Sequence, residues 1–210
     1  MKNLFSIDSP FMRFLGKFAD LIFLNILYLV SCIPIVTIGA ANAALYDVTM
    51  RLSRDEAYIW RHYWQAFASN FKKATLIWVI LLPIVVVLFG CAQYYIHNDL
   101  PNRNVSLALL GIASIAWLSV YSWVFPLQAR FENTVGNTLK NALICSFSFL
   151  PRTILITFLN AILPFVIQYF GALILIGLFV LLLIWFSGIA YISTLLLRKN
   201  MQQLEELAEQ

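Results

Sequence analysis

The chain has 210 residues, of which 61% are apolar, 15% aromatic and only 11% charged. Soluble domains carry about a quarter charged residues, so this composition excludes an ordinary soluble globular protein. The net charge of +4 is not gathered in a folded basic domain, which argues against nucleic-acid binding. The apolar residues form blocks of about twenty between short polar stretches, the pattern of helices dissolved in a lipid bilayer.

The first helix is expected to begin at Pro10. The preceding Asp8 and Ser9 offer an N-cap side chain, and proline is favoured at the first helical position. Arg13 and Lys17 lie on one side of its first half and aromatic residues on the other. That half therefore belongs at the membrane interface.

The first membrane segment is expected over about 18–38. Pro34 removes a backbone donor and Gly39 loosens the chain, so this segment should bend or break rather than form one rod. The small residues 41–43 also resemble a signal-peptide cleavage site after an apolar run. Cleavage there would leave the basic residues of the next loop outside, so a membrane segment is the better interpretation.

Residues 53–56 read Ser-Arg-Asp-Glu, a capping box that predicts a helix over 54–73. An aromatic stripe follows one face of this helix: Trp60, Tyr63, Trp64, Phe67 and Phe71. The helix could pack on the rest of the protein, or it could lie in the headgroup layer with its tryptophans at the water boundary. The second interpretation is favoured, and both could hold in part.

The second and third spans are expected over 74–96 and 106–127, joined by a polar turn at 97–104. Small residues gather on one face of the third span: Ala108, Gly111, Ser119 and Ser122. Small residues let membrane helices approach closely, so we interpret this face as a close-packing surface.

A second interfacial helix is expected over 128–142, followed by spans over 153–169 and 172–196. The fourth span carries the most polar stripe in the membrane: Thr153, Thr157, Asn160 and Gln168. Hydrogen bonding between helices explains such a stripe better than solute binding does. In sum, the sequence predicts an all-α integral membrane protein, a single membrane domain over 1–210 with about five transmembrane helices and interfacial helices before spans two and four.

From the second span onward, connecting segments rich in lysine and arginine alternate with segments that have few or none. Their distribution puts 46–73, 128–152 and the C-terminus in the cytoplasm, because basic loops stay inside. The basic N-terminal residues also favour the inside, yet a full first span would carry them out. Either the N-terminal tail crosses, or residues 21–45 dip in and return through the break at Pro34. We expect a full span because a return leg would be too short to cross.

Two weaker patterns concern repeats and cysteines. Asn70 and Lys73 recur at the same spacing as Asn137 and Lys140, each pair just ahead of an expected span. This suggests two related units, each an interfacial helix followed by a helical hairpin. Cys32, Cys91 and Cys145 stand singly in apolar stretches, so they are read as small buried hydrophobes.

Several segments, in order along nearly the whole chain, resemble the YesL-like bacterial membrane proteins, a domain-of-unknown-function family. They are Asp8-Ser9-Pro10-Phe11, NILYLVSCIPIVTIGAANAALY from Asn25, Asn70-Phe71-Lys72-Lys73, Ala129-Arg130-Phe131 and Lys140-Asn141-Ala142. The Cys-Ile-Pro-Ile-Val-Thr-Ile-Gly string from Cys32 is the most specific. The family commonly has proline after that glycine, whereas Ala40 stands there in this chain.

The resemblance implies a location in the bacterial cytoplasmic membrane and a role beside carbohydrate use, because such proteins are often encoded near sugar-uptake transporters and two-component sensors. We expect a non-catalytic accessory or regulatory partner of a transporter permease or sensor kinase. The alternative is a transporter or channel component for a neutral solute such as a sugar. The side chains of Asn160, Thr157 and Gln168 would then bind the solute. Five helices enclose little volume, so such a pathway would need a homo-oligomer.

Catalysis has little support in the sequence. His62 and His97 fall on opposite sides of the bilayer in the expected topology, so they cannot share a metal or a proton relay. No carboxylate pair, nucleophile elbow or phosphate-binding loop appears. We therefore expect no enzyme activity and no cofactor.

Overall fold

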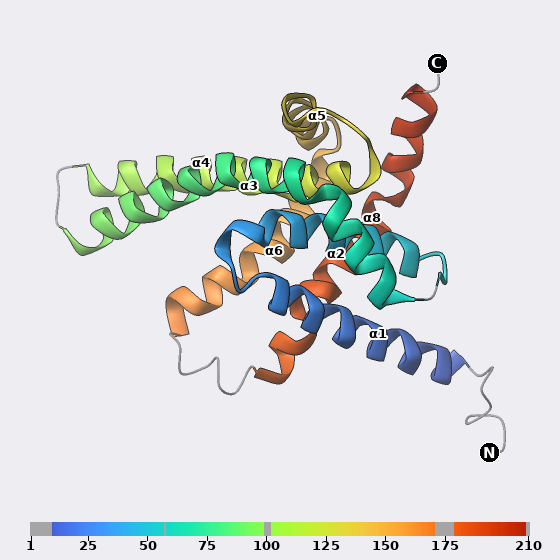
Figure 1. Ribbon diagram of the computed structural model, residues 1–210. Helices are drawn as coiled ribbons and strands as arrows, with labels where there is room; N and C mark the ends of the chain where they lie inside the picture. Colours follow the sequence, from blue (N-terminus) through green and yellow to red (C-terminus); the bar gives the residue numbers. More distant parts are fainter. Residues whose placement is uncertain (1–9, 57, 99–101, 171–178, 209–210) are drawn as a thin grey trace.

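A computed structural model describes residues 10–56, 58–98, 102–170 and 179–208, and every regular element in these ranges is helical (Figure 1). This confirms the all-α prediction for that part of the chain. The elements are α1 (Pro10–Ser31), the 3-10 turn η1 (Ile35–Thr37), α2 (Ile38–Leu52), α3 (Ile59–His97), α4 (Arg103–Arg130), α5 (Val135–Ser148), α6 (Leu150–Phe170) and α8 (Phe179–Ala208).

Three described helices, α1, α3 and α4, are long and apolar enough to cross a membrane. The number rises to four if α5 and α6, which meet at a bend of 107°, count as one broken span. Part of the fifth expected span, at 172–178, lies outside the described residues, and its remainder forms the first half of α8.

α1 and α2 form a helical hairpin around Pro34, where the predicted break occurs. Near the break, the Tyr28 hydroxyl donates to Asn42 Oδ1 at 3.4 Å. At the opposite end, Lys17 Nζ lies 2.8 Å from Asp55 Oδ1. The start of α1 and the turn after α2 are therefore at the same end of the molecule, and the expectation that a full first span separates them is wrong.

The physical reason lies in what surrounds α2. Its 15 residues extend only about 22 Å at 1.5 Å per residue, short of a hydrocarbon core of about 30 Å. Most of them are buried, however, so α2 is enclosed by protein rather than lipid. A return leg inside a bundle does not need the length or the apolar surface of an independent span.

α2 and α3 approach each other closely at Gly39. An added Cβ at Gly39 would lie 2.2 Å from the carbonyl oxygen of Ala74, so only glycine fits. Beside it, Trp78 Nε1 donates to the carbonyl oxygen of Ile35 at 2.9 Å and ties η1 to α3. Gly39, just before Ala40, is thus a close packing contact inside α2.

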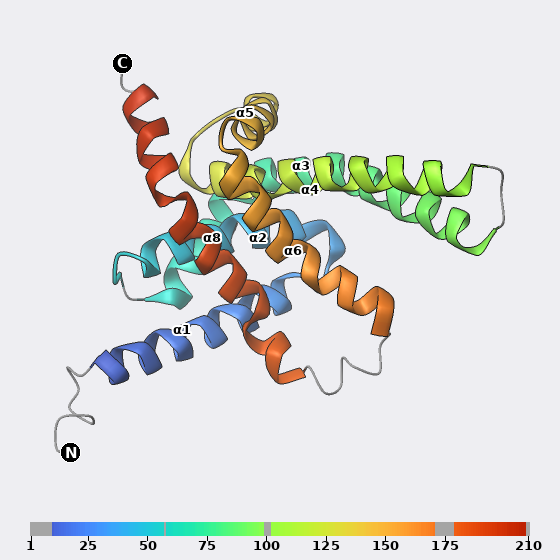
Figure 2. The same cartoon turned by 180° about the vertical axis from the view of Figure 1, so that it is seen from behind.

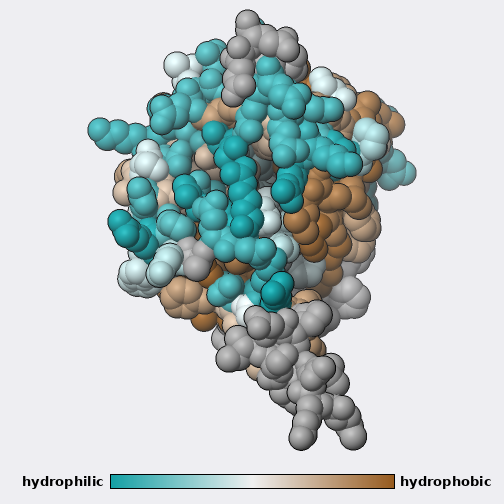
Figure 3. Space-filling model, turned by 90° about the vertical axis from the view of Figure 1, so that its right-hand side faces the viewer, coloured by the Kyte–Doolittle hydropathy of each residue, from teal (hydrophilic) through white to brown (hydrophobic). Residues whose placement is uncertain are grey.

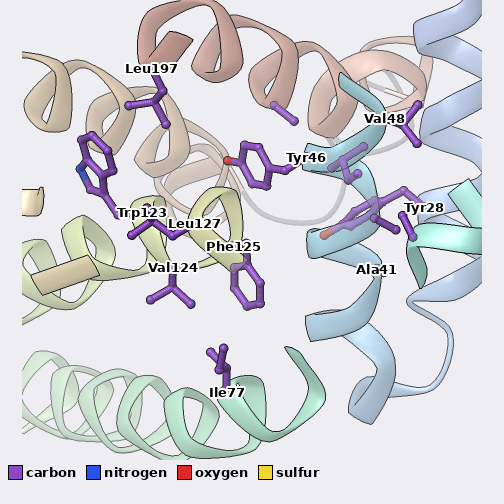
Figure 4. Packing of buried hydrophobic residues seen from close by; sticks show 14 of the residues in the cluster. Tyr28, Ala41, Tyr46, Val48, Ile77, Trp123, Val124, Phe125, Leu127 and Leu197 are labelled. Atoms are coloured by element: carbon purple, nitrogen blue, oxygen red, sulfur yellow. The ribbon is translucent and has the colours of Figure 1, made fainter. Parts of the chain in front are cut away.

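The core continues from α2 into α3, α4 and α8. Figure 4 shows Ile77 of α3 facing Val124 and Phe125 of α4, with Tyr46 of α2 and Leu197 of α8 further into the same cluster. All five side chains are buried. The apolar core is therefore made by helices from both halves of the chain.

α3 is one continuous helix of 39 residues, which replaces the separate helices expected over 54–73 and 74–96. Residues 53–56 do not form a capping box. Instead, Ser53 Oγ donates back to the carbonyl oxygen of Met50 at 2.6 Å, so it closes the end of α2. The chain then turns through Asp55 and Tyr58, with φ of 60° and 75°, before α3 begins at Ile59.

The helix expected over 128–142 begins later, because α4 continues to Arg130. α5 starts after Thr134, whose side chain accepts from the Asn137 backbone N–H at 3.4 Å. The proposed repeat is not visible in the fold, since Asn70 lies inside the long α3 whereas Asn137 lies in the separate, short α5.

The molecule has a polar end and apolar sides. Figures 1 and 2 show α3 and α4 side by side as a long hairpin that projects away from the end where α1 begins and α8 ends. Its outer surface is apolar, with Val87, Leu109 and Ile112 exposed. Figure 3, which views the opposite end, is largely hydrophilic. This division is the one expected of a protein that sits in a bilayer with one charged face in water.

The cysteines follow the same division. Cys145 is buried and Cys32 is half-buried, but Cys91 is exposed on the projecting hairpin, contrary to the expectation for it. This position lies outside the protein core, and composition alone cannot distinguish an exposed apolar position from a buried one.

Candidate functional site

The polar stripe of α6 faces α4. Trp123 Nε1 donates to Thr153 Oγ1 at 2.8 Å, and the hydroxyl oxygens of Ser119 and Thr157 are 3.4 Å apart. Asn160 Nδ2 is 3.5 Å from Ser122 Oγ. The stripe thus serves helix-to-helix hydrogen bonding along its described length. Gln168 belongs to α6, but its side chain lies outside the described part.

The small-residue face of α4 divides into two parts. Ser119 and Ser122 lie against α6 and take part in the contacts above. Ala108 and Gly111 lie on the projecting hairpin and are exposed, and a Cβ at Gly111 would meet nothing within 4 Å. Only the half of this face nearer the polar end packs against the described chain.

The aromatic stripe of α3 is divided in the same way. Tyr63 is buried in the core, whereas Trp60, Trp64 and Phe71 are exposed. The Trp64 ring meets those of Trp60 and Phe67 at centroid distances of 5.8 and 5.6 Å. One residue of the stripe thus packs inward, whereas the tryptophans lie on the surface of the described chain. That this surface lies in the headgroup layer stays a prediction.

A cavity of about 370 Å³ opens among α2, α3 and the end of α4; we call it the polar cleft. Its charged and amide lining residues are Asp47, Arg51, His62, Gln65, Asn70, Lys73, Gln128, Arg130 and Glu132. Sequence analysis missed this site because its residues come from three helices and share no local motif.

One glutamine holds the cleft floor together. Gln128 Nε2 donates to Asn70 Oδ1 at 3.1 Å, and Gln128 Oε1 accepts from the Thr138 hydroxyl at 3.2 Å. Both amide atoms of Gln128 are therefore hydrogen-bonded. Because Gln128 and Thr138 are buried, a missing bond at this position would cost about 1–3 kcal/mol. These bonds connect α3, α4 and α5 beneath the cleft.

The charges of the cleft are partly paired. Arg51 Nε lies 2.8 Å from Asp47 Oδ2, and this hydrogen bond raises the pKa of the Arg51 guanidinium. Within the described ranges, Lys73 and Glu132 lie in the cleft wall outside any ion pair. The cleft can therefore offer one free charge of each sign to a ligand or a partner protein.

A smaller cavity of about 140 Å³ lies deeper, among α1, α2, α4, α6 and α8; we call it the inner pocket. Its polar groups are the amides of Asn42 and Asn160 and the tyrosine hydroxyls of its wall, and its aromatic lining includes Trp185. No acidic, basic or histidine side chain is among its described lining residues. Amides, hydroxyls and aromatic faces suit neutral polar molecules.

The described part of the chain brings no set of metal-ligating side chains together, and its two histidines lie far apart. No group of three or more histidine, cysteine, aspartate or glutamate side chains there could hold a metal ion. His62 lines the polar cleft, while His97 ends the same helix. About 50 Å of helix path separates them at 1.5 Å per residue.

Residues 21–90 match the family model described as "Protein of unknown function, DUF624". The matched range runs from α1 to the projecting part of α3, and so includes the whole of α2 and one wall of the polar cleft. The resemblance to YesL-like proteins agrees with this match. No curated protein and no solved structure matches the chain.

Proposed function

We propose that this chain is a non-catalytic, multi-pass protein of the bacterial cytoplasmic membrane that acts as an accessory or regulatory subunit. The observation that carries the proposal is the polar cleft, which combines a cavity of about 370 Å³ with Lys73 and Glu132 at the polar end of an otherwise apolar molecule. Such a cleft fits a charged segment of a partner protein, because complementary charges select partners and set their orientation.

The orientation follows from the positions of basic residues. Lys17, Arg51, Arg130 and the C-terminal half of α8 all lie towards the polar end. Since basic segments stay inside, this end belongs in the cytoplasm. The resemblance to proteins encoded beside sugar transporters supports a transporter permease or a sensor kinase as the partner.

Affinity purification from the native cells tests the proposal. The tagged protein is isolated in mild detergent, and co-purifying proteins are identified by mass spectrometry. Lys73→Glu should lose the permease or kinase that the wild type recovers. Lys199→Glu, which makes the same charge change on an exposed part of α8 outside the cleft, should retain it. Recovery of the same proteins with the wild type and with both variants would contradict a partner role for the cleft.

A neutral-solute carrier is the second candidate, and the inner pocket is the observation that favours it. Its volume of about 140 Å³ holds about four or five waters at about 30 Å³ each, or one small hydroxylated solute. The amide nitrogens of Asn42 and Asn160 each donate to a carbonyl oxygen of their own helix at 3.0 Å. Their contacts with other side chains are longer, at 3.4 Å for Asn42 and 3.5 Å for Asn160.

Solute flux into liposomes tests this second candidate. Asn160→Leu should abolish sugar or polyol uptake, while Asn104→Leu, at an exposed position on the projecting hairpin, should leave it unchanged. Equal flux in protein-free and protein-containing liposomes would eliminate transport by this chain alone.

A further inference from the structure

A second charged cavity lies at the polar end, on the α8 side of α2; we call it the arginine pocket. Its volume is about 140 Å³. Three guanidinium groups line it, and each comes from a different element: Arg54 from the turn after α2, Arg130 from the last residue of α4, and Arg198 from α8. The fold therefore gathers cations that are far apart in the sequence.

Each acidic side chain in or beside the pocket forms its ion pair with an arginine other than Arg54 and Arg198. Glu205 is the one carboxylate among its described lining residues, and it is hydrogen-bonded to Arg130. The bond with Arg130 lowers the pKa of the Glu205 carboxyl, so this group stays ionised. Of the neighbouring carboxylates, Asp47 and Glu56 pair with Arg51. Within the described ranges, Arg54 and Arg198 have no ion-pair partner.

The floor of the pocket is apolar. Leu197 and Met201 are buried and Met50 is half-buried beneath the arginines. Next to them, the hydroxyl oxygens of Thr49 and Thr194 are 2.9 Å apart and satisfy each other. The pocket thus has a cationic rim and an apolar base at the boundary between the polar end and the helical core.

We propose that the arginine pocket binds the phosphate group of an anionic phospholipid, held between Arg54 and Arg198. A planar guanidinium group bonds two phosphate oxygens in a fixed fork, whereas a lysine ammonium acts as a point charge. Basic pockets between membrane helices on the cytoplasmic side are suited to lipid headgroups. The apolar floor favours a lipid over a free anion, because inorganic phosphate would gain nothing from methionine and leucine side chains. This site shares Arg130 with the polar cleft, but Arg54 and Arg198 are not among the cleft's lining residues, and the proposal does not depend on a partner protein.

Native mass spectrometry of the purified full-length protein tests the site. Wild type, Arg54→Gln/Arg198→Gln and Arg61→Gln/Lys199→Gln are equilibrated with equal amounts of phosphatidylglycerol and phosphatidylcholine in detergent micelles. The second pair is the matched control, since it removes two positive charges from exposed positions outside the pocket. Because Arg54 and Arg198 are exposed, neither substitution disturbs the core, and unfolding curves in detergent check this directly.

Wild type and control should retain phosphatidylglycerol in preference to phosphatidylcholine. The pocket variant should bind phosphatidylglycerol at least about tenfold more weakly, as expected from the loss of two charge-assisted phosphate contacts. Equal weakening in both double variants would mean that net charge alone attracts the lipid, and would overturn the proposal. Displacement of phosphatidylglycerol by added inorganic phosphate would identify a free-anion site and overturn the lipid assignment.

Discussion

Gly39→Ala should separate α2 from α3. The new Cβ would lie 2.2 Å from the carbonyl oxygen of Ala74, 2.8 Å from its carbonyl carbon and 2.6 Å from Trp78 Cβ. Carbon contacts are ordinarily about 3.5–4.0 Å, so the helices must move apart by about 1 Å, which forfeits up to half of the dispersion energy of each contact across the interface. Two of the three atoms are backbone and cannot rotate away. We therefore expect a loss of about 3 kcal/mol, the upper end of the usual range for overpacking.

The assay is reversible unfolding of the purified protein in mixed micelles, followed by circular dichroism as a denaturing detergent is added. Gly111→Ala is the matched control, because a Cβ there meets nothing within 4 Å. That substitution should leave stability unchanged or raise it by up to about 1 kcal/mol through helix propensity. If the free energy of unfolding of Gly39→Ala lies within about 0.5 kcal/mol of the wild-type value, the close approach of α2 and α3 is refuted.

Three further predictions concern the buried polar contacts, the pH dependence and the topology. Asn25→Leu should cost about 0.5–1.5 kcal/mol in the same unfolding assay, because Asn25 Oδ1 accepts from the buried Ser187 N–H at 3.1 Å and leucine removes this hydrogen bond between α1 and α8; an unchanged unfolding curve would contradict this. Since Arg130 lowers the pKa of Glu205 below its usual 4.5, the pair stabilises the fold above that pH and weakens as pH falls through the folded pKa. The stability difference between wild type and Glu205→Gln should thus be present at neutral pH and vanish in acid; a difference independent of pH would exclude the pairing. For the topology, the native cysteines are replaced and single cysteines are placed before α1, near the end of α8 and in 97–104. The first two should react with a membrane-impermeant thiol reagent from the same face of the membrane, and the third from the other face. Reaction of all three from one face would overturn the orientation.

Local signals predicted much of the helical framework. The position of Pro10 indicated the start of α1, and Pro34 indicated the break that ends it. The apolar blocks located α4 and α6 to within a few residues, because the length and composition of a membrane helix are properties of the segment itself.

The interpretation of residues 53–56 failed because its pattern is ambiguous. Serine followed by glutamate three positions later is typical of a helix start, but the same side chains can close the preceding helix. Here Ser53 bonds back to Met50, and Glu56 lies 3.6 Å from Arg51. Which helix such residues cap depends on where the chain goes next, and that is decided by packing.

The length rule for spans failed at α2 for a related reason. It assumes that each segment faces lipid on its own, whereas α2 is covered by its neighbours. The polar cleft was beyond sequence analysis altogether, because Lys73, Gln128 and Asp47 become neighbours only once α2, α3 and α4 have docked.

The enclosed position of α2 has a consequence for biogenesis. As the ribosome delivers the chain from its N-terminus, α2 emerges with Asn42, Asp47 and Arg51 before the helices that will bury it have been made. We therefore expect α2 to insert together with α1 as a hairpin, and its polar side chains to be covered only after α3, α4 and α8 have been made.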